Sequence, residues 1–301
     1  MRVWAGARRG WVVDRTMGRM ARLPDGVLVP AIGQGTWHLG DSVARRPEEA
    51  AALRAGLEAG LSLVDTAEMY GEGAAESLVG EALRGLDASE RPFLVSKVYP
   101  HRADRAHIFE ACAASRARLG VDRLDLYLLH WRGTAPLAET VACMGELIER
   151  GWIARWGVSN FDVDDMIDLL ATPGGLDCAT DQVLYNLGSR GIEYELLPWL
   201  HDRHIPVMAY CPLAQGGRLS AGILDDEVVR EVAAAHDAAP AQVMLSFAVR
   251  SGWVIAIPKA TSATHARENA AAMGLQLTEG ELRALSKRFP APHCKVPLDV
   301  Q

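Results

Sequence analysis

The sequence predicts a single-domain (β/α)8 barrel, and two observations lead to that prediction. From residue 29 onward, short apolar runs alternate with amphipathic helical patterns, and successive runs lie about thirty residues apart. The runs are hydrophobic throughout, which is typical of parallel strands that are covered on both faces. Eight such units in one chain indicate a parallel barrel with an outer ring of helices.

The strands of this barrel are expected at eight apolar runs, which span residues 31–35, 61–65, 93–97, 124–130, 153–159, 179–182, 206–210 and 254–258. The helical patterns between them span residues 47–59, 74–86, 105–119, 137–150, 163–170, 226–235 and 241–250. Pro47 suits the first turn of the first helix, because the N–H that proline lacks would have no partner there. The last interval between strands is longer and holds two helical patterns.

An open, doubly wound sheet is the competing fold. When such a sheet binds a dinucleotide, it carries a Gly-x-Gly-x-x-Gly fingerprint after its first strand. Here Gly33 and Gly35 are followed by Thr36, Trp37 and His38, so the third glycine is absent. The barrel is therefore the preferred interpretation.

Composition and charge exclude several classes of protein. With 49% hydrophobic and 23% charged residues, the 301-residue chain is not expected to be disordered. No apolar run reaches the roughly 18 residues of a membrane-spanning helix. The net charge of −7 opposes a nucleic-acid or anionic membrane partner. The five cysteines are scattered without a Cys-x-x-Cys pair, which favours reduced thiols in a cytoplasmic protein over a disulfide framework or a zinc site.

The amino-terminal segment is set apart from the barrel. Residues 1–19 contain five arginines and no long apolar stretch, so a signal peptide is not expected. We predict that residues 1–19 form a disordered extension and that residues 20–301 form the barrel domain.

Polar side chains with catalytic potential follow three neighbouring strands. Asp65 ends the second run and Tyr70 follows it by five residues, while Lys97 ends the third run and His130 the fourth. The active sites of barrels lie at the carboxyl ends of the strands, so these four groups are expected at one mouth. Buried charges need partners, which makes Asp65 and Lys97 natural neighbours.

This set suits proton donation to a carbonyl oxygen. A tyrosine has a pKa near ~10, and a lysine ammonium beside it is expected to lower that pKa. Asp65 would hold Lys97 charged and in place, while a neutral His130 would orient the carbonyl. Tyr70 as an acid needs a hydride source that no side chain provides, and a nicotinamide cofactor provides one.

Taken alone, each of these residues has a structural interpretation as a cap, a turn residue or a hydrogen-bonded strand end. Lys97 also fits the Schiff-base lysine of a cofactor-free aldolase. No serine or cysteine nucleophile accompanies the histidine, and no His-x-His or His-Glu-x-x-His cluster would hold a metal. Four different functional groups at consecutive strand ends are not a packing requirement, so the functional interpretation of the set is preferred.

Six segments resemble the aldo-keto reductase superfamily over roughly residues 25–290. They are residues 33–37 (GQGTW), 65–71 (DTAEMYG), 94–97 (LVSK), 128–131 (LLHW), 157–161 (GVSNF) and 257–259 (IPK). Within the superfamily, residues 188–194 (GSRGIEY) are similar to bacterial aldehyde reductases of the methylglyoxal type. The resemblance implies an enzyme that transfers hydride from NADPH to an aldehyde or ketone, such as a small, aromatic or α-oxo aldehyde, without metal or flavin.

The resemblance also implies a role for individual residues. Tyr70 is implied to be the acid, with Lys97 tuning it and Asp65 supporting Lys97, and His130 is implied to orient the substrate. The residues implied to bind the cofactor are Gly35, Thr36, Trp37, Asp65, Ser159, Asn160, Gln182, Tyr210, Leu213, Gln215, Lys259, Thr261, Arg267, Glu268 and Asn269. Those implied to line the substrate site are Trp37, Tyr70, His130 and Trp131.

Two positions depart from the pattern of the resembled family. Ala260 stands where many relatives have a serine, and His265 where many have an arginine that holds the 2′-phosphate. Lys259 favours NADPH, while NADH stays open. A non-catalytic NADPH-sensing subunit is the alternative to a reductase. We expect a monomer or weak homo-oligomer with a small carbonyl compound as its partner, and a tail over residues 291–301 that folds across the mouth.

Overall fold

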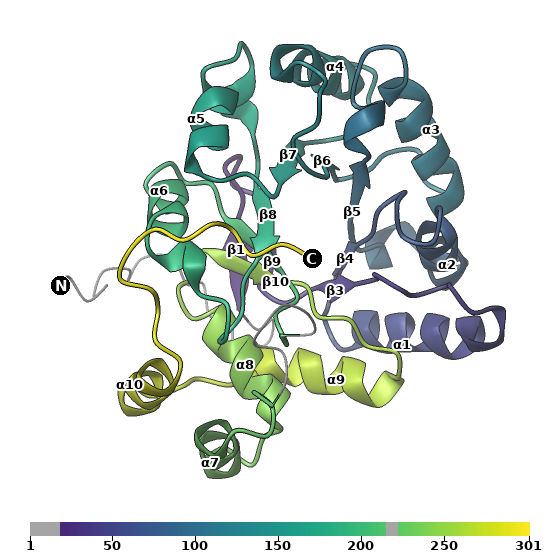
Figure 1. The fold of residues 1–301 in the computed structure, drawn as a ribbon. Coiled ribbons are helices and arrows are strands. Elements are labelled where there is room, and N and C mark those ends of the chain that lie inside the picture. Colours follow the sequence, from purple (N-terminus) through teal and green to yellow (C-terminus); the bar gives the residue numbers. More distant parts are fainter. Residues whose placement is uncertain (1–18, 215–221) are drawn as a thin grey trace.

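The computed structural model describes residues 19–214 and 222–301, which form a parallel barrel with helices on its outside (Figure 1). Eight parallel strands follow one another in chain order around the sheet, from β3 to β10. The sheet closes on itself, because Ile32 bridges Ala256 and Gly35 bridges Lys259, both in the parallel sense. The predicted (β/α)8 barrel is confirmed.

All the predicted strands and helices are present, in the predicted order. The barrel strands are β3 (Gln34–Gly35), β4 (Leu63–Asp65), β5 (Phe93–Val98), β6 (Leu126–Leu129), β7 (Trp156–Ser159), β8 (Asp181–Leu184), β9 (Val207–Tyr210) and β10 (Val254–Ala256). The helices are α1 (Arg46–Glu58), α2 (Ala74–Leu83), α3 (Ile108–Leu119), α4 (Leu137–Glu149), α5 (Val163–Leu170), α6 (Leu196–His201), α7 (Glu227–Ala235), α8 (Pro240–Ala248), α9 (Ala263–Ala271) and α10 (Glu279–Arg288). Over the described ranges, no helix is long and apolar enough to cross a membrane.

Three helices were not predicted, and each has a weak apolar pattern. Helix α6 has only six residues, with Pro198 among them. Helix α9 buries Ala266, Asn269 and Ala270, which form a narrow face with little hydrophobic character. Helix α10 buries Leu285 alone. A periodic apolar stripe is the main sequence signal for a helix, and these segments lack one.

Gly35 belongs to the seam where the barrel closes. A Cβ atom at this position would lie 2.6 Å from the carbonyl oxygen of Ile257, closer than such atoms approach. The Gly35 N–H donates to the carbonyl oxygen of Pro258 at 2.9 Å. Gly35 therefore serves the close contact between β3 and the segment that follows β10.

A β-hairpin that the sequence analysis did not predict covers the amino end of the barrel. Strand β1 (Met20–Arg22) pairs antiparallel with β2 (Leu28–Pro30), and Gly26 in the turn between them has a φ of 90°. Leu23 and Val29 belong to the same buried cluster as the inward-facing residues at the floor of the barrel. The Asp-Gly step before an apolar residue is a hairpin signal that was available in the sequence.

Arg19 corrects the predicted boundary of the amino-terminal extension. Its guanidinium is buried and donates to the carbonyl oxygen of Leu275 at 2.7 Å and to Ser246 Oγ at 3.2 Å. Arg19 is thus part of the fold, because it supplies donors to polar groups beneath α8. The remainder of the predicted extension, residues 1–18, lies outside the described residues.

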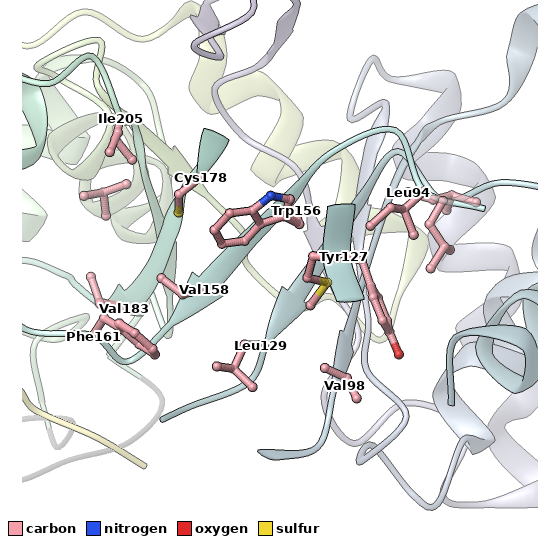
Figure 2. Packing of buried hydrophobic residues seen from close by; sticks show 14 of the residues in the cluster. Leu94, Val98, Tyr127, Leu129, Trp156, Val158, Phe161, Cys178, Val183 and Ile205 are labelled. Carbon is pink, nitrogen blue, oxygen red and sulfur yellow. The ribbon is translucent and has the colours of Figure 1, made fainter. Parts of the chain in front are cut away.

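Alternation along the strands separates an apolar outer face from the barrel interior. Figure 2 shows Tyr127 and Leu129 of β6 beside Trp156 and Val158 of β7, buried between the sheet and the helices. Each such side chain stabilises the fold by about 1.5–3 kcal/mol through burial. Because the side-chain period of a strand is two, the residues between these point into the barrel. By the same alternation, the side chains of the last residues of several strands point toward the mouth of the barrel.

Candidate active site

A buried ion pair lies at the mouth, where the carboxyl ends of the strands meet. Asp65 ends β4 and Lys97 lies on the neighbouring strand β5. Lys97 Nζ lies 2.7 Å from Asp65 Oδ2, and both residues are almost completely buried. Burial raises the pKa of Asp65 and lowers that of Lys97, while the attraction between the two charges limits both shifts. The two side chains are paired as expected.

Lys97 also holds the hydroxyl group of Tyr70. Its ammonium donates to Asp65 Oδ2, to the carbonyl oxygen of Thr66 at 2.9 Å and to Tyr70 Oη at 2.9 Å. These three contacts use all three N–H groups of the lysine. Since an ammonium group can only donate, the phenolic oxygen accepts in this bond. The proton of Tyr70 is therefore left for another acceptor.

The pKa of Tyr70 departs from the prediction that Lys97 would lower it. Burial raises this pKa well above its usual value, and the negative charge of Asp65 adds to the rise. Lys97 does not reverse the effect, because Asp65 lies as close to it as Tyr70 does and offsets its charge. The expectation of a lowered pKa is thus wrong for this arrangement. Tyr70 is a neutral phenol at physiological pH.

His130 follows β6 and faces Tyr70. The two rings lie 5.8 Å apart between centroids at an angle of 74°. Burial lowers the pKa of His130 to about 2, and the positive charge of Lys97 contributes. His130 is neutral, as predicted. Within the described part of the chain its Nδ1 atom is buried without a hydrogen-bond partner.

The loop that carries Tyr70 is braced against the end of β5. The buried carboxylate of Glu68 accepts from the Tyr99 N–H at 2.8 Å and from Arg102 Nη1 at 2.6 Å. On its other side, Gly71 lies so close to Asp41 that a Cβ atom there would come within 2.6 Å of Asp41 Oδ1. These contacts fix the loop on both sides and so limit the movement of Tyr70.

A second group of polar side chains occupies the ends of β7, β8 and β9. Ser159 Oγ donates to the carbonyl oxygen of Gln182 at 2.7 Å, and Asn160 Nδ2 donates to the carbonyl oxygen of His130 at 3.2 Å. Tyr210 Oη donates to Asn160 Oδ1 at 2.8 Å. Asn160 has a φ of 59°, a left-handed conformation that asparagine tolerates better than most residues. The structure thus brings Ser159, Asn160, Gln182 and Tyr210 together beside the first group.

Both groups line one pocket of about 290 Å³. The predicted site residues in its lining are Gly35, Thr36, Trp37, Asp65, Tyr70, His130, Trp131, Ser159, Asn160, Gln182, Tyr210 and Lys259. Lys97 lies beneath this surface and contacts the pocket through Tyr70. Within residues 19–214 and 222–301, no cluster of three or more His, Cys, Asp or Glu side chains could hold a metal ion.

The pocket also has lining residues that the sequence analysis did not select. They are His38, Met69, Cys211, Ile257 and Gln301. His38 and Cys211 directly follow Trp37 and Tyr210, which were selected, so proximity in sequence was an available signal. For Gln301 the signal was the predicted fold of the tail across the mouth, which did not specify the residue that would reach the pocket.

An aromatic wall borders the pocket on one side. Trp37 and Trp131 line it, and Tyr99 meets Trp131 edge to face at 6.2 Å between ring centroids. Tyr99 itself is not part of the pocket lining. The rim is therefore apolar and about one-third exposed at Trp131 (37%), which suits a substrate with an apolar part.

The remaining residues implied to bind the cofactor extend away from this pocket. Thr261 precedes α9, while Arg267, Glu268 and Asn269 belong to that helix. Asn269 is buried, Arg267 is exposed, and Leu213 is buried after β9. The structure places these residues outside the pocket lining. Gln215 lies outside the described residues.

The carboxyl-terminal tail crosses the mouth, as predicted (Figure 1). Lys295 pairs with Asp162 at 3.3 Å and with Glu195 at 3.1 Å, and Leu298 packs against the main core cluster. The last residue, Gln301, accepts a hydrogen bond at Oε1 from Cys211 Sγ at 2.9 Å. The tail thereby supplies one wall of the pocket.

Comparison with known proteins agrees with this geometry. The model of the Aldo/keto reductase family matches residues 31–288. The chain is 53% identical over 282 residues to methylglyoxal reductase YeaE of Escherichia coli (strain K12), covering 94% of this chain and 99% of that protein. It is 31% identical to methylglyoxal reductase DkgA of Yersinia pestis, covering 90% of this chain and 93% of that one.

A solved structure shows the same architecture. An aldo-keto reductase from Klebsiella pneumoniae, crystallised in complex with NADPH, superposes with a TM-score of 0.91 at 49% sequence identity. The match covers 94% of this chain and 99% of that chain. The described barrel and its mouth therefore have a close structural counterpart.

Proposed function

This chain belongs to the aldo/keto reductase family. We propose that it reduces aldehydes or ketones to alcohols, with NADPH as hydride source and Tyr70 as proton donor. The observation that carries the proposal is the direction of the hydrogen bond between Lys97 and Tyr70. Lys97 donates, so the phenolic proton is free for a carbonyl oxygen in the pocket. As negative charge develops on Tyr70, the adjacent ammonium stabilises it.

His130 supplies a second donor to the same oxygen. A neutral imidazole carries one N–H, and a buried N–H without a partner is rarer in proteins than a buried acceptor without one. Because Nδ1 is the buried and unpartnered nitrogen, the proton belongs on Nε2. His130 therefore orients the carbonyl while Tyr70 protonates it.

The polar group at the ends of β7, β8 and β9 fits the nicotinamide end of NADPH. Ser159, Asn160 and Gln182 offer a hydroxyl and two amides, which match the donors and acceptors of a carboxamide, and Tyr210 offers a ring for stacking. NADPH supplies the hydride when it is bound. Lys259 would hold the phosphate end, assisted by Thr261 just before α9 and by Arg267 within that helix.

The aromatic wall supports aldehydes with an apolar part, and the relatives support α-oxo aldehydes. Trp37 and Trp131 provide the apolar surface next to the two donors, Tyr70 and His130. Two relatives of this chain are named methylglyoxal reductases. We therefore propose small, aromatic and α-oxo aldehydes as the substrate class.

The test is the loss of absorbance at the reduced-nicotinamide band, with NADPH and NADH assayed separately. The panel contains methylglyoxal, aromatic aldehydes and simple ketones. Rapid loss with NADPH and aldehydes is expected, and the comparison with NADH measures the cofactor preference of a chain that has Ala260 and His265 at these positions. Tight NADPH binding without turnover on any member of the panel would overturn the proposal in favour of a cofactor-sensing subunit.

Two further predictions concern the protein as a whole. We propose a cytoplasmic chain that is a monomer or associates weakly. Size-exclusion chromatography with light scattering checks the second part, with a mass near the 32.6 kDa of one chain expected at micromolar concentration.

A further inference from the structure

Gln182 makes a hydrogen bond across the whole width of the barrel. It lies on β8, four strands from β4 in either direction around the closed sheet. Even so, Gln182 Nε2 lies 2.8 Å from Asp65 Oδ1, and both residues are buried. The bond forms because both side chains point inward at the same level of the barrel. The second oxygen of Asp65 is the one that Lys97 holds.

The chemistry of the partners fixes the orientation of the Gln182 amide. An ionised carboxylate can only accept hydrogen bonds, so the amide must present its nitrogen to Asp65. The same Nε2 lies 2.9 Å from Met208 Sδ, a weak acceptor. Both amide hydrogens are therefore directed at protein atoms. No donor among the described residues reaches the amide oxygen Oε1.

The free amide oxygen is available to the pocket. Gln182 lines that pocket together with Ser159 and Asn160. A ligand amide group that donates to Oε1 would polarise the Gln182 amide and strengthen its bond to Asp65, because hydrogen bonds in a chain reinforce one another. Gln182 is thus placed between the proposed carboxamide site and the buried ion pair.

We propose that Gln182 is a positioning residue that holds Asp65 for Lys97 and Tyr70 and that transmits occupancy of the carboxamide site to these three residues. The inference rests on the proposed function, in which a nicotinamide carboxamide occupies that site. It gives Gln182 a second task besides contact with the cofactor. Its consequence is that the proton donor is fully arranged only when the hydride source is in place.

The effect of Gln182 on Lys97 and Tyr70 depends on the ionisation of Asp65. Its burial favours the protonated form, and the hydrogen bonds from Lys97 and Gln182 oppose that. Without the Gln182 donor, Asp65 takes up a proton more readily. A protonated Asp65 accepts more weakly from Lys97, so the ammonium is held less firmly in the position from which it donates to Tyr70.

The first test replaces the amide by an apolar side chain of similar length, Gln182→Met. The Asp65 carboxyl is titrated by carbon-13 NMR in protein labelled at aspartate side chains, with the signal assigned from Asp65→Asn. In Gln182→Met without cofactor, the titration is expected to move upward by about one to two pH units, the size of a lost hydrogen bond to a charged group. Addition of NADPH is expected to shift the Asp65 signal in the wild type and not in this variant.

Ser159→Ala is the matched control, because Ser159 Oγ contacts the carboxamide site and the Gln182 backbone but not Asp65. Both variants are expected to bind NADPH more weakly. Only Gln182→Met is expected to change the Asp65 titration and to shift the pH profile of kcat, and kcat in this variant is expected to be about tenfold lower than in the wild type. An unchanged Asp65 titration in Gln182→Met would leave Gln182 as a cofactor contact alone and overturn the inference.

Gln182→Glu serves if the methionine variant does not fold. A carboxyl group within 3 Å of Asp65 forces the pair to share a proton, so the Asp65 titration is expected to split into two steps. A single wild-type titration in Gln182→Glu would contradict the bond across the barrel. Failure of the proposed function would give a different result, because the wild-type protein itself would consume no NADPH with any carbonyl compound.

Discussion

The two ends of this barrel are built from the same strands but have opposite chemistry. At the amino end, Leu63, Val95 and Leu126 point inward and pack against the β1–β2 hairpin. Two residues further along β4 and β5, the inward positions hold Asp65 and Lys97. The amino end is a closed apolar core, and the carboxyl end is a polar surface at the base of an open pocket.

The difference shows how one scaffold meets two demands. Apolar burial at the amino end stabilises the fold without needing any exact partner. The charges at the mouth are costly to bury and are tolerated only because each has a partner within hydrogen-bond distance. Inside the barrel, apolar packing therefore occupies one end, and the capacity for chemistry lies at the other.

The largest effect is expected from Tyr70→Phe at the mouth. This change removes the proposed phenolic proton donor and leaves the ring in place. We expect kcat for aldehyde reduction to fall by about a thousandfold, within the range of general acid catalysis. NADPH affinity, measured by fluorescence titration, should stay within a few-fold of the wild type. Tyr99→Phe, which alters a tyrosine outside the pocket lining, is the control and should retain most of the activity.

The next largest effect is expected from breaking the buried ion pair. Lys97→Met leaves the Asp65 carboxylate buried without its main partner and should lower the free energy of unfolding by about 3–5 kcal/mol. The double change Asp65→Asn with Lys97→Met removes both charges and should recover most of that loss in urea denaturation. Its activity should stay low, since Tyr70 is still without the ammonium. Recovery of activity along with stability would contradict the role given to Lys97.

The sequence predicted the mouth better than the opposite end, and the reasons are physical. Strand period and the rule that barrel sites lie at carboxyl ends were enough to place Asp65, Lys97 and His130 together. The pKa direction of Tyr70 was predicted wrongly, because it depends on how burial and Asp65 balance Lys97, and only distances decide that. The β1–β2 hairpin was missed because its strands have three residues each, too short for a period to be recognised, and the Asp-Gly step of its turn was the signal overlooked.

Leu126→Ala probes the closed amino end and should have the reverse signature of Tyr70→Phe. Leu126 is fully buried under the hairpin, so truncation leaves a cavity and should lower the free energy of unfolding by about 2–5 kcal/mol. The kcat of the folded protein should stay within about twofold of the wild type. A drop in kcat comparable to that of the mouth variants would show that the two ends are not independent.

The smallest effect concerns a carboxyl group that belongs to neither end. Asp181 is fully buried on the outer face of β8, and within the described ranges its Oδ2 has no hydrogen-bond partner. Burial raises its pKa well above the usual value, so the folded state keeps a proton that the unfolded state releases above about pH 4. Asp181 therefore lowers stability as pH rises through the interval between the two pKa values.

Asp181→Asn keeps the shape of this side chain and removes the ionisation. The variant and the wild type should have nearly equal free energies of unfolding near pH 4. By pH 8 the variant should be more stable by about 1–3 kcal/mol, because each pKa unit of difference between the folded and unfolded states corresponds to about 1.4 kcal/mol. The exposed Asp177, changed to Asn in the same way, should show no such dependence on pH. A constant difference across this range would mean that Asp181 has the same pKa in the folded and unfolded states. Burial on the outer face of β8 would then not disfavour its ionisation.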